Sequence, residues 1–150
     1  MINDLYSARI LALAANMPRA GRLAAPQGSA ERVAKLCGSR ITADVALDEA
    51  GAIADFAQEV QACALGQAAA AVLGENVIGA SSDEIETALE AFRAMLKEGG
   101  PPPEGRFKDL AVLQPVKDYP ARHASSLLAF EAALAAVRQA QARTSGADAA

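Results

Sequence analysis

The sequence of 150 residues has no tryptophan, and aromatic residues make up only 4% of it. A core built around large rings is therefore excluded, although 52% of the residues are hydrophobic. Alanine alone accounts for 38 residues. Because alanine is the best helix former and is depleted in strands, the composition favours closely packed helices. The length suits one domain.

Cysteine is also scarce. Two cysteines cannot form a disulfide framework, and there is only one histidine. The N-terminus does not resemble a secretory signal, because Asp4 and Arg9 interrupt its apolar pattern. We therefore expect a cytoplasmic protein whose thiols are reduced.

Long hydrophobic runs are absent, and none approaches the roughly 18 residues that a membrane span requires. The formal net charge of −4 and a pI near 5.0 disfavour a surface that binds nucleic acid. The sequence thus predicts neither a membrane nor a nucleic-acid partner.

The N-terminal segment has the spacing of an amphipathic helix. Apolar residues recur at intervals of three and four over 2–17, and Asn3 or Asp4 is available as the cap. Pro18 and Gly21 are expected to end this helix. A loop rich in glycine, proline and polar residues follows, to about Ser29.

An extended pattern follows the loop. Roughly alternating apolar residues occupy 31–39, 40–48 and 52–60, and the residues 48–51 have the composition of a hairpin turn. This pattern predicts a small antiparallel sheet of two or three strands.

Helical spacing returns at Ala64. Ser81 and Glu84 have the spacing of a capping box, which predicts the start of a second helix. The segment 99–105, GGPPPEG, breaks regular structure, and 107–113 is a short helical candidate. A last helix is expected from Tyr119 and Pro120, with Asp118 as its cap, and its inward residues are Leu127, Phe130, Leu134 and Val137.

Strands and helices are thus segregated along the chain. The predicted fold class is α+β, with a sheet of two or three antiparallel strands packed against several α-helices. The expected domain spans 1–140, and 141–150 is expected to be a frayed C-terminal tail because its last residues have little to pack.

Three side chains could bind a soft metal. Cys37 lies between the first two predicted strands, Cys63 lies where the last strand meets the next helix, and His123 lies in the first turn of the last helix. Two thiolates and an imidazole suit zinc or an iron–sulfur centre better than a hard cation. The residues alone also allow both cysteines to be small buried hydrophobes. A helix N-terminus would favour the thiolate of Cys63.

The sequence resembles the NifU/IscU-type scaffolds of iron–sulfur cluster assembly, and the SufU branch in particular, over about residues 5–137. The segment LYSARILALAANMPRAG resembles the family's first helix and Asn-x-Pro-Arg-x-Gly turn. AKLCGS and DFAQEVQACALGQAAAAV resemble its first two cysteine motifs, and LQPVKDYPARHASSLLAFEAAL resembles the third. The interval containing GGPPPEGRFKDLAVL is similar to the SufU insertion.

The resemblance implies a site of three cysteines and an aspartate, and this chain departs from it. Cys37 and Cys63 match the first two cysteines, but Ser39 stands where the family has aspartate. The third cysteine falls on Ser125 if the Arg-to-aromatic spacing is aligned. It falls on Ala124 if His123 is matched to the family's histidine. The implied ligands are therefore Cys37, Cys63 and His123, for a zinc or iron ion or a transient Fe–S cluster.

The family further implies a non-enzymatic scaffold or sulfur-relay protein. Its partners would be a cysteine desulfurase and apo Fe–S recipient proteins, and a homodimer could supply a missing ligand. Two alternatives stay open. One is a metal-free adaptor of the same fold that binds a desulfurase or a recipient. The other is a thiol enzyme with Cys63 as nucleophile and His123 as base.

Overall fold

A computed structural model describes the backbone of residues 6–149 and the side chains as far as Arg143. Three strands precede most of the helices, which confirms the predicted α+β class. The residues proposed as the first cap, Asn3 and Asp4, lie outside the described part. The first described helix, α2 (Ala8–Ala15), is capped by Ser7, whose hydroxyl accepts a hydrogen bond from the Ile10 amide at 3.2 Å.

The sheet has three antiparallel strands in the order β1 (Gly28–Ala34), β2 (Ser39–Leu47) and β3 (Ile53–Gln61). The third strand is thereby confirmed, although β1 begins and ends earlier than the alternation predicted. The hairpin turn is confirmed as well. The Asp48 carboxylate accepts hydrogen bonds from the amides of Ala50 and Ala52, at 2.9 and 3.0 Å.

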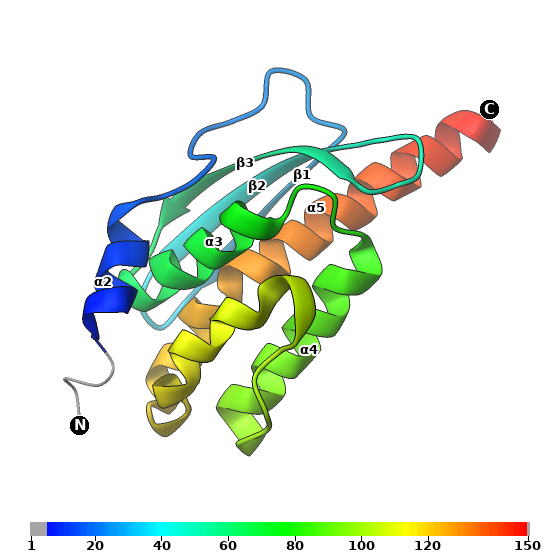
Figure 1. The fold of residues 1–150 in the computed structure, drawn as a ribbon. Helices are drawn as coiled ribbons and strands as arrows, with labels where there is room; N and C mark the ends of the chain where they lie inside the picture. The colour runs from blue at the N-terminus through cyan, green and yellow to red at the C-terminus, as the bar shows by residue number, and fades with distance from the viewer. Residues whose placement is uncertain (1–5, 150) are drawn as a thin grey trace.

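Helices cover one face of the sheet in two layers (Figure 1). The helices α3 (Ala64–Asn76) and α5 (His123–Ala149) lie against the sheet, and α4 (Ser82–Glu98) packs beyond them with the 3₁₀ helix η1 (Gly105–Asp118). No helix in the described part is long and apolar enough to cross a membrane.

The central helix α3 is buried almost all round. From Leu65 to Gly74 every residue except Gln67 is buried. Four consecutive alanines, 68–71, lie in this stretch and are fully buried. Small side chains let the helix approach its neighbours closely on every side. The core can therefore be densely packed without the large ring of a tryptophan.

The capping box that opens α4 is confirmed. The Ser81 hydroxyl accepts from the Glu84 amide at 3.1 Å, and the Glu84 carboxylate accepts from the Ser81 amide at 3.3 Å. Ion pairs tie this helix to its neighbours, since Glu84 binds Arg106 and Glu86 binds Arg138, each at 2.9 Å.

The predicted start of the last helix is wrong. Asp118 belongs to η1 and is not a cap, because a short 3₁₀ turn, η2 (Pro120–Arg122), intervenes before α5 begins at His123. At the other end α5 extends to Ala149, and the expected domain boundary at 140 stays a prediction. Arg143 donates hydrogen bonds to the carbonyls of Pro26 and Gln27, at 3.4 and 3.0 Å, so this part of the helix has partners.

A buried carboxylate anchors the loop that precedes β1. Asp44 is fully buried on β2 and accepts hydrogen bonds from Arg22 Nε at 2.7 Å, Ser29 Oγ at 2.6 Å and the Leu23 amide at 3.1 Å. Burial raises the pKa of this carboxyl, but the hydrogen bonds from Arg22, Ser29 and Leu23 outweigh burial, and its pKa is lowered overall. The folded protein therefore stabilises the ionised carboxylate of Asp44.

Asp44 predicts a pH dependence of stability. Since its folded pKa is lower than its unfolded pKa of about 3.9, its stabilisation is present above that unfolded value and is lost as the pH falls through the folded pKa. Urea unfolding at pH 7 should show Asp44→Asn to be less stable by about 1–3 kcal/mol, and the difference should shrink in acid. The exposed Asp55→Asn, whose pair with Arg19 spans 3.9 Å, is the control and should change little. Equal losses of stability in Asp44→Asn and Asp55→Asn would contradict this prediction.

Candidate functional site

Cys37 lies in the tight turn that joins β1 to β2. The turn is closed by the Gly38 amide, which donates to the Ala34 carbonyl at 2.9 Å, and Gly38 has a φ of +72°, which glycine adopts without strain. The Cys37 side chain is exposed, and its Sγ lies 3.0 Å from the Ser39 Oγ. The neighbouring Leu36 is 83% exposed. This thiol is thus presented at the surface.

Cys63 is the N-cap residue of α3, as predicted from the sequence. Its side chain is half-buried, and its Sγ lies 3.5 Å from the Ser125 Oγ in the first turn of α5. Gly66 allows the two helices to come this close, because a Cβ at that position would lie 2.9 Å from the Ser125 carbonyl oxygen. Ser125 itself is buried and donates to the Arg122 carbonyl at 3.2 Å.

The strand register brings the two cysteines to the same end of the sheet. At this end of the sheet Arg40 of β2 pairs with Gln61 of β3, so the start of β2 and the end of β3 lie side by side. Cys37 lies just before the start of β2, and Cys63 lies just after the end of β3. We call Cys37, Cys63, Ser39 and Ser125 the dithiol site.

Hydrogen bonding favours the thiolate of Cys37. The Ser39 hydroxyl is the largest influence and lowers the pKa of this thiol, partial burial opposes it, and the Ser125 hydroxyl lowers the pKa further. Of the two residues that the third motif offers, Ser125 is the one that contacts a thiol, that of Cys63.

His123 does not join the two thiols. It is buried, and its Nε2 lies 3.0 Å from the Val116 carbonyl oxygen and 3.2 Å from that of Lys117, so this nitrogen carries the hydrogen. The ring therefore fastens the start of α5 to the end of η1. Within residues 6–143 no three side chains of histidine, cysteine, aspartate or glutamate gather as a metal site. The role of His123 as a third ligand stays a prediction.

The same geometry removes the support for a thiol enzyme. A general base must reach the thiol that it activates. The hydrogen bonds of Cys63 and His123 go to Ser125 and to backbone carbonyls respectively. Ser39 and Ser125 are the side chains whose hydroxyls contact the thiols, and the sequence identifies both only as replacements of family ligands.

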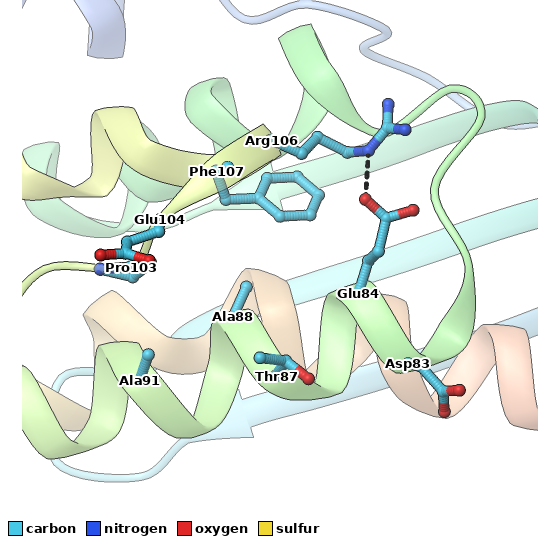
Figure 2. Close-up of a pocket in the computed structure, with 10 residues that line it drawn as sticks. Asp83, Glu84, Thr87, Ala88, Ala91, Pro103, Glu104, Arg106 and Phe107 are labelled. Atoms are coloured by element: carbon cyan, nitrogen blue, oxygen red, sulfur yellow. Dashed lines mark hydrogen bonds and ion pairs between the residues drawn. The ribbon is translucent and has the colours of Figure 1, made fainter.

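Away from the dithiol site, a pocket lies between α4 and the start of η1 (Figure 2). It has a volume of about 280 Å³ and an apolar wall that includes Ala88, Ala91 and Phe107. At one end Arg106 binds Glu84 and also donates to the carbonyls of Asn76, Ile78 and Gly79. Its lining contains no thiol or imidazole, and no sequence motif pointed to it.

Comparisons with known proteins agree with this architecture. The family model of the NifU-like N terminal domain matches residues 5–145. The crystal structure of a nitrogen-fixing NifU-like protein (N-terminal) from Brucella abortus superposes with a TM-score of 0.91 at 50% identity, covering 94% of this chain and 97% of that one. A putative scaffold of the SUF system from Fervidobacterium islandicum gives a TM-score of 0.79 over 88% of this chain and 98% of that one. At 24% identity, that likeness supports the fold alone.

A curated relative has a named role. The iron-sulfur cluster assembly scaffold protein IscU of Thermotoga maritima is 30% identical over 95 residues, which is 63% of this chain. The match spans 66% of that protein, slightly less than two thirds of its length.

Proposed function

Since the chain belongs to the NifU-like N-terminal domain family, we propose that it is a scaffold or sulfur-relay protein of iron–sulfur cluster assembly. Iron and sulfur are its cargo, and the chain itself is not an enzyme of a separate reaction. The observation that carries the proposal is that the strand register brings Cys37 and Cys63 to the same end of the sheet, where the Ser39 hydroxyl contacts the first thiol and the Ser125 hydroxyl contacts the second.

The side chains of the dithiol site suit an iron ion or cluster that is bound only for a time. Two thiolates are good ligands for iron or zinc, whereas serine hydroxyls are poor ones beside them. Cys37 and Cys63 would therefore hold the ion or cluster, and Ser39 and Ser125 would leave the remaining positions to water, sulfide or a ligand from another chain. An open shell of this kind makes release to a recipient easy.

Protein partners follow from the same proposal. Sulfur would come from a cysteine desulfurase, and the finished cluster would go to an apo Fe–S protein. Cys37 and the neighbouring Leu36 are exposed, so a partner can reach this thiol without unfolding the chain. A second copy of the chain could supply a further ligand.

Anaerobic reconstitution with iron and sulfide tests the proposal. The unmodified protein should develop visible absorbance from sulfur-to-iron charge transfer, and Cys37→Ser and Cys63→Ser should each reduce it at least tenfold, on the scale of losing an essential interaction. The exposed Thr87→Ser on α4 serves as the control and should load like the parent protein. Thermal melts should show that all variants fold. A parent protein that stays colourless and free of iron would overturn the proposal.

A second function is a metal-free adaptor that uses the same surface to bind a desulfurase or a recipient. It is favoured by one observation, that within the described side chains the two thiols have hydroxyl neighbours and no third metal ligand. Elemental analysis of protein purified without a tag or chelator separates the two functions. One zinc or iron per chain would exclude the adaptor.

A further inference from the structure

We propose that the exposed edge of β1 binds an extended segment of a partner protein, which adds a strand to the sheet and places an acidic side chain against Arg32. The inference goes beyond the proposed function, because it concerns how a partner is held and does not depend on iron. Since β1 leads into the turn that carries Cys37, a partner bound in this way would be held beside the dithiol site.

Within the described residues, β1 is an edge strand. The strand order is β1-β2-β3, so β1 pairs with β2 on one side and has α5 near its other side (Figure 1). The Ser29 amide identifies the groups that point outward, because it donates to the Gln139 side chain of α5 at 2.7 Å. The backbone groups of an antiparallel strand alternate between its two sides, so those of Glu31 and Val33 point outward as well.

These two positions are open to a further strand. Among the described residues, the outward N–H and C=O groups of Glu31 and Val33 have one partner, the Arg32 guanidinium, which donates to the Glu31 carbonyl at 2.9 Å. All three residues are exposed, and Val33 is 47% exposed although it is apolar. Unpaired backbone groups along an exposed edge are a template on which another chain can pair.

A pocket of about 410 Å³ lies along this edge, between β1 and the helices. It is lined by Arg32 of β1, Leu89 of α4, and Glu131, Leu134, Ala135 and Arg138 of α5. When a segment adds to a sheet edge, backbone hydrogen bonds hold it and pockets receive its alternate side chains. The residue opposite Arg32 has its side chain on the same face of the sheet as that of Arg32, and therefore at this pocket.

The charges of the pocket favour an acidic side chain at that position. Arg138 pairs with Glu86 at 2.9 Å, and Glu131 pairs with Arg93 at 3.3 Å, so these charges are already balanced. The hydrogen bond of Arg32 goes to a backbone carbonyl, and no carboxylate among the described side chains pairs with it. A glutamate of the added strand can place its carboxylate at Arg32 and its methylene groups on the apolar wall of the pocket.

The probe is the blocked pentapeptide Thr-Val-Glu-Val-Thr, which is titrated at low salt into isotope-labelled, iron-free protein. Amide chemical shifts in NMR spectra should change in a saturable way at Glu31 and Val33. The same peptide with lysine in place of glutamate should bind about tenfold more weakly, because it brings a like charge to Arg32. Methylation of both valine nitrogens removes the donors that face β1 and should abolish binding.

Variants of the chain test the backbone and the charge separately. Val33→Pro removes an outward N–H that the pairing with β2 does not use, so the sheet should form, but the peptide should bind at least about tenfold more weakly. Val33→Thr keeps this N–H and is the matched control. Arg32→Glu should weaken binding of the glutamate peptide about tenfold and make the lysine peptide the better ligand. Thermal melts show which variants fold, and the exchange of charge at Arg32 decides the matter if Val33→Pro does not.

Three results would overturn the inference. The first is a titration that leaves the amide shifts of Glu31 and Val33 unchanged, and the second is equal binding of the glutamate and lysine peptides. The third is a parent protein that is a dimer by light scattering and a monomer after Val33→Pro, because a second copy would then occupy the edge. A protein that loads a cluster but does not bind the peptide contradicts only this inference, and one that binds the peptide but never loads iron contradicts only the scaffold role.

Discussion

Replacing Phe130 by alanine is expected to lower the free energy of unfolding by about 3–5 kcal/mol. Phe130 is fully buried on α5 and packs edge-to-face on two other rings. The centroid of Phe92 is 5.9 Å away and that of Phe107 is 5.2 Å away. The three rings join α5, α4 and η1 in a protein with four phenylalanines and no tryptophan. Removing the central ring leaves a cavity that small neighbouring side chains cannot fill.

Urea unfolding followed by circular dichroism measures the effect, because the chain has no tryptophan for fluorescence. Phe130→Leu fills most of the space and should cost less than half as much as the alanine variant. Leu11→Ala is the surface control, since Leu11 is 49% exposed, and it should change the free energy by less than about 0.5 kcal/mol. A loss below about 1 kcal/mol in Phe130→Ala would mean that the rings are not a shared core.

Introducing a thiol at Ser125 is expected to strengthen cargo binding. The Ser125 Oγ lies 3.5 Å from the Cys63 Sγ, and the Ser125 hydroxyl contributes to the lowered pKa of Cys37, so Ser125→Cys adds a third sulfur to the dithiol site. Since even groups outside the ligand shell change metal affinity by about 10–100-fold, an added thiolate ligand should slow the loss of a reconstituted cluster to a chelator at least tenfold. The decay of the visible absorbance measures this rate.

The neighbouring position gives a matched control. Ser126 is also buried, and its hydroxyl bonds to the same Arg122 carbonyl, at 2.9 Å, but its contacts do not include Cys63. Ser126→Cys adds the same atoms one residue along α5 and should leave the decay rate within about twofold of the parent protein's. Equal stabilisation by both variants would show that an extra thiol acts without forming part of the site.

Local sequence signals predicted the features that are fixed locally. The Ser81–Glu84 capping box needs only residues three apart, and alternation identified the strands through their buried faces. The positions of Cys37 in a turn and Cys63 at a helix start follow from these elements. Their placement at the same end of the sheet depends on the antiparallel register of β2 and β3, which an alternating pattern implies but does not specify.

The features that the sequence did not predict involve partners that are distant along the chain or that compete for the same residue. Arg143 binds a carbonyl of Gln27, 116 residues earlier in the chain, so no local pattern shows that α5 continues past 140. Asp118 has the composition of a cap, but the 3₁₀ helix η1 includes it. His123 could turn toward the thiols or toward η1, and the buried carbonyls of Val116 and Lys117 decide the outcome, because such carbonyls require a donor.

The central claim is that Cys37 and Cys63 together hold the metal cargo, and X-ray absorption on the zinc-loaded protein tests it most directly. Zinc needs no added sulfide, so every sulfur ligand comes from the chain. The account predicts two sulfur neighbours at about 2.3 Å, with lighter atoms at about 2.0–2.2 Å completing the shell. Cys63→Ser should retain one sulfur neighbour at most. A zinc shell of nitrogen and oxygen alone, or unchanged zinc binding after both cysteines are replaced, would contradict the account.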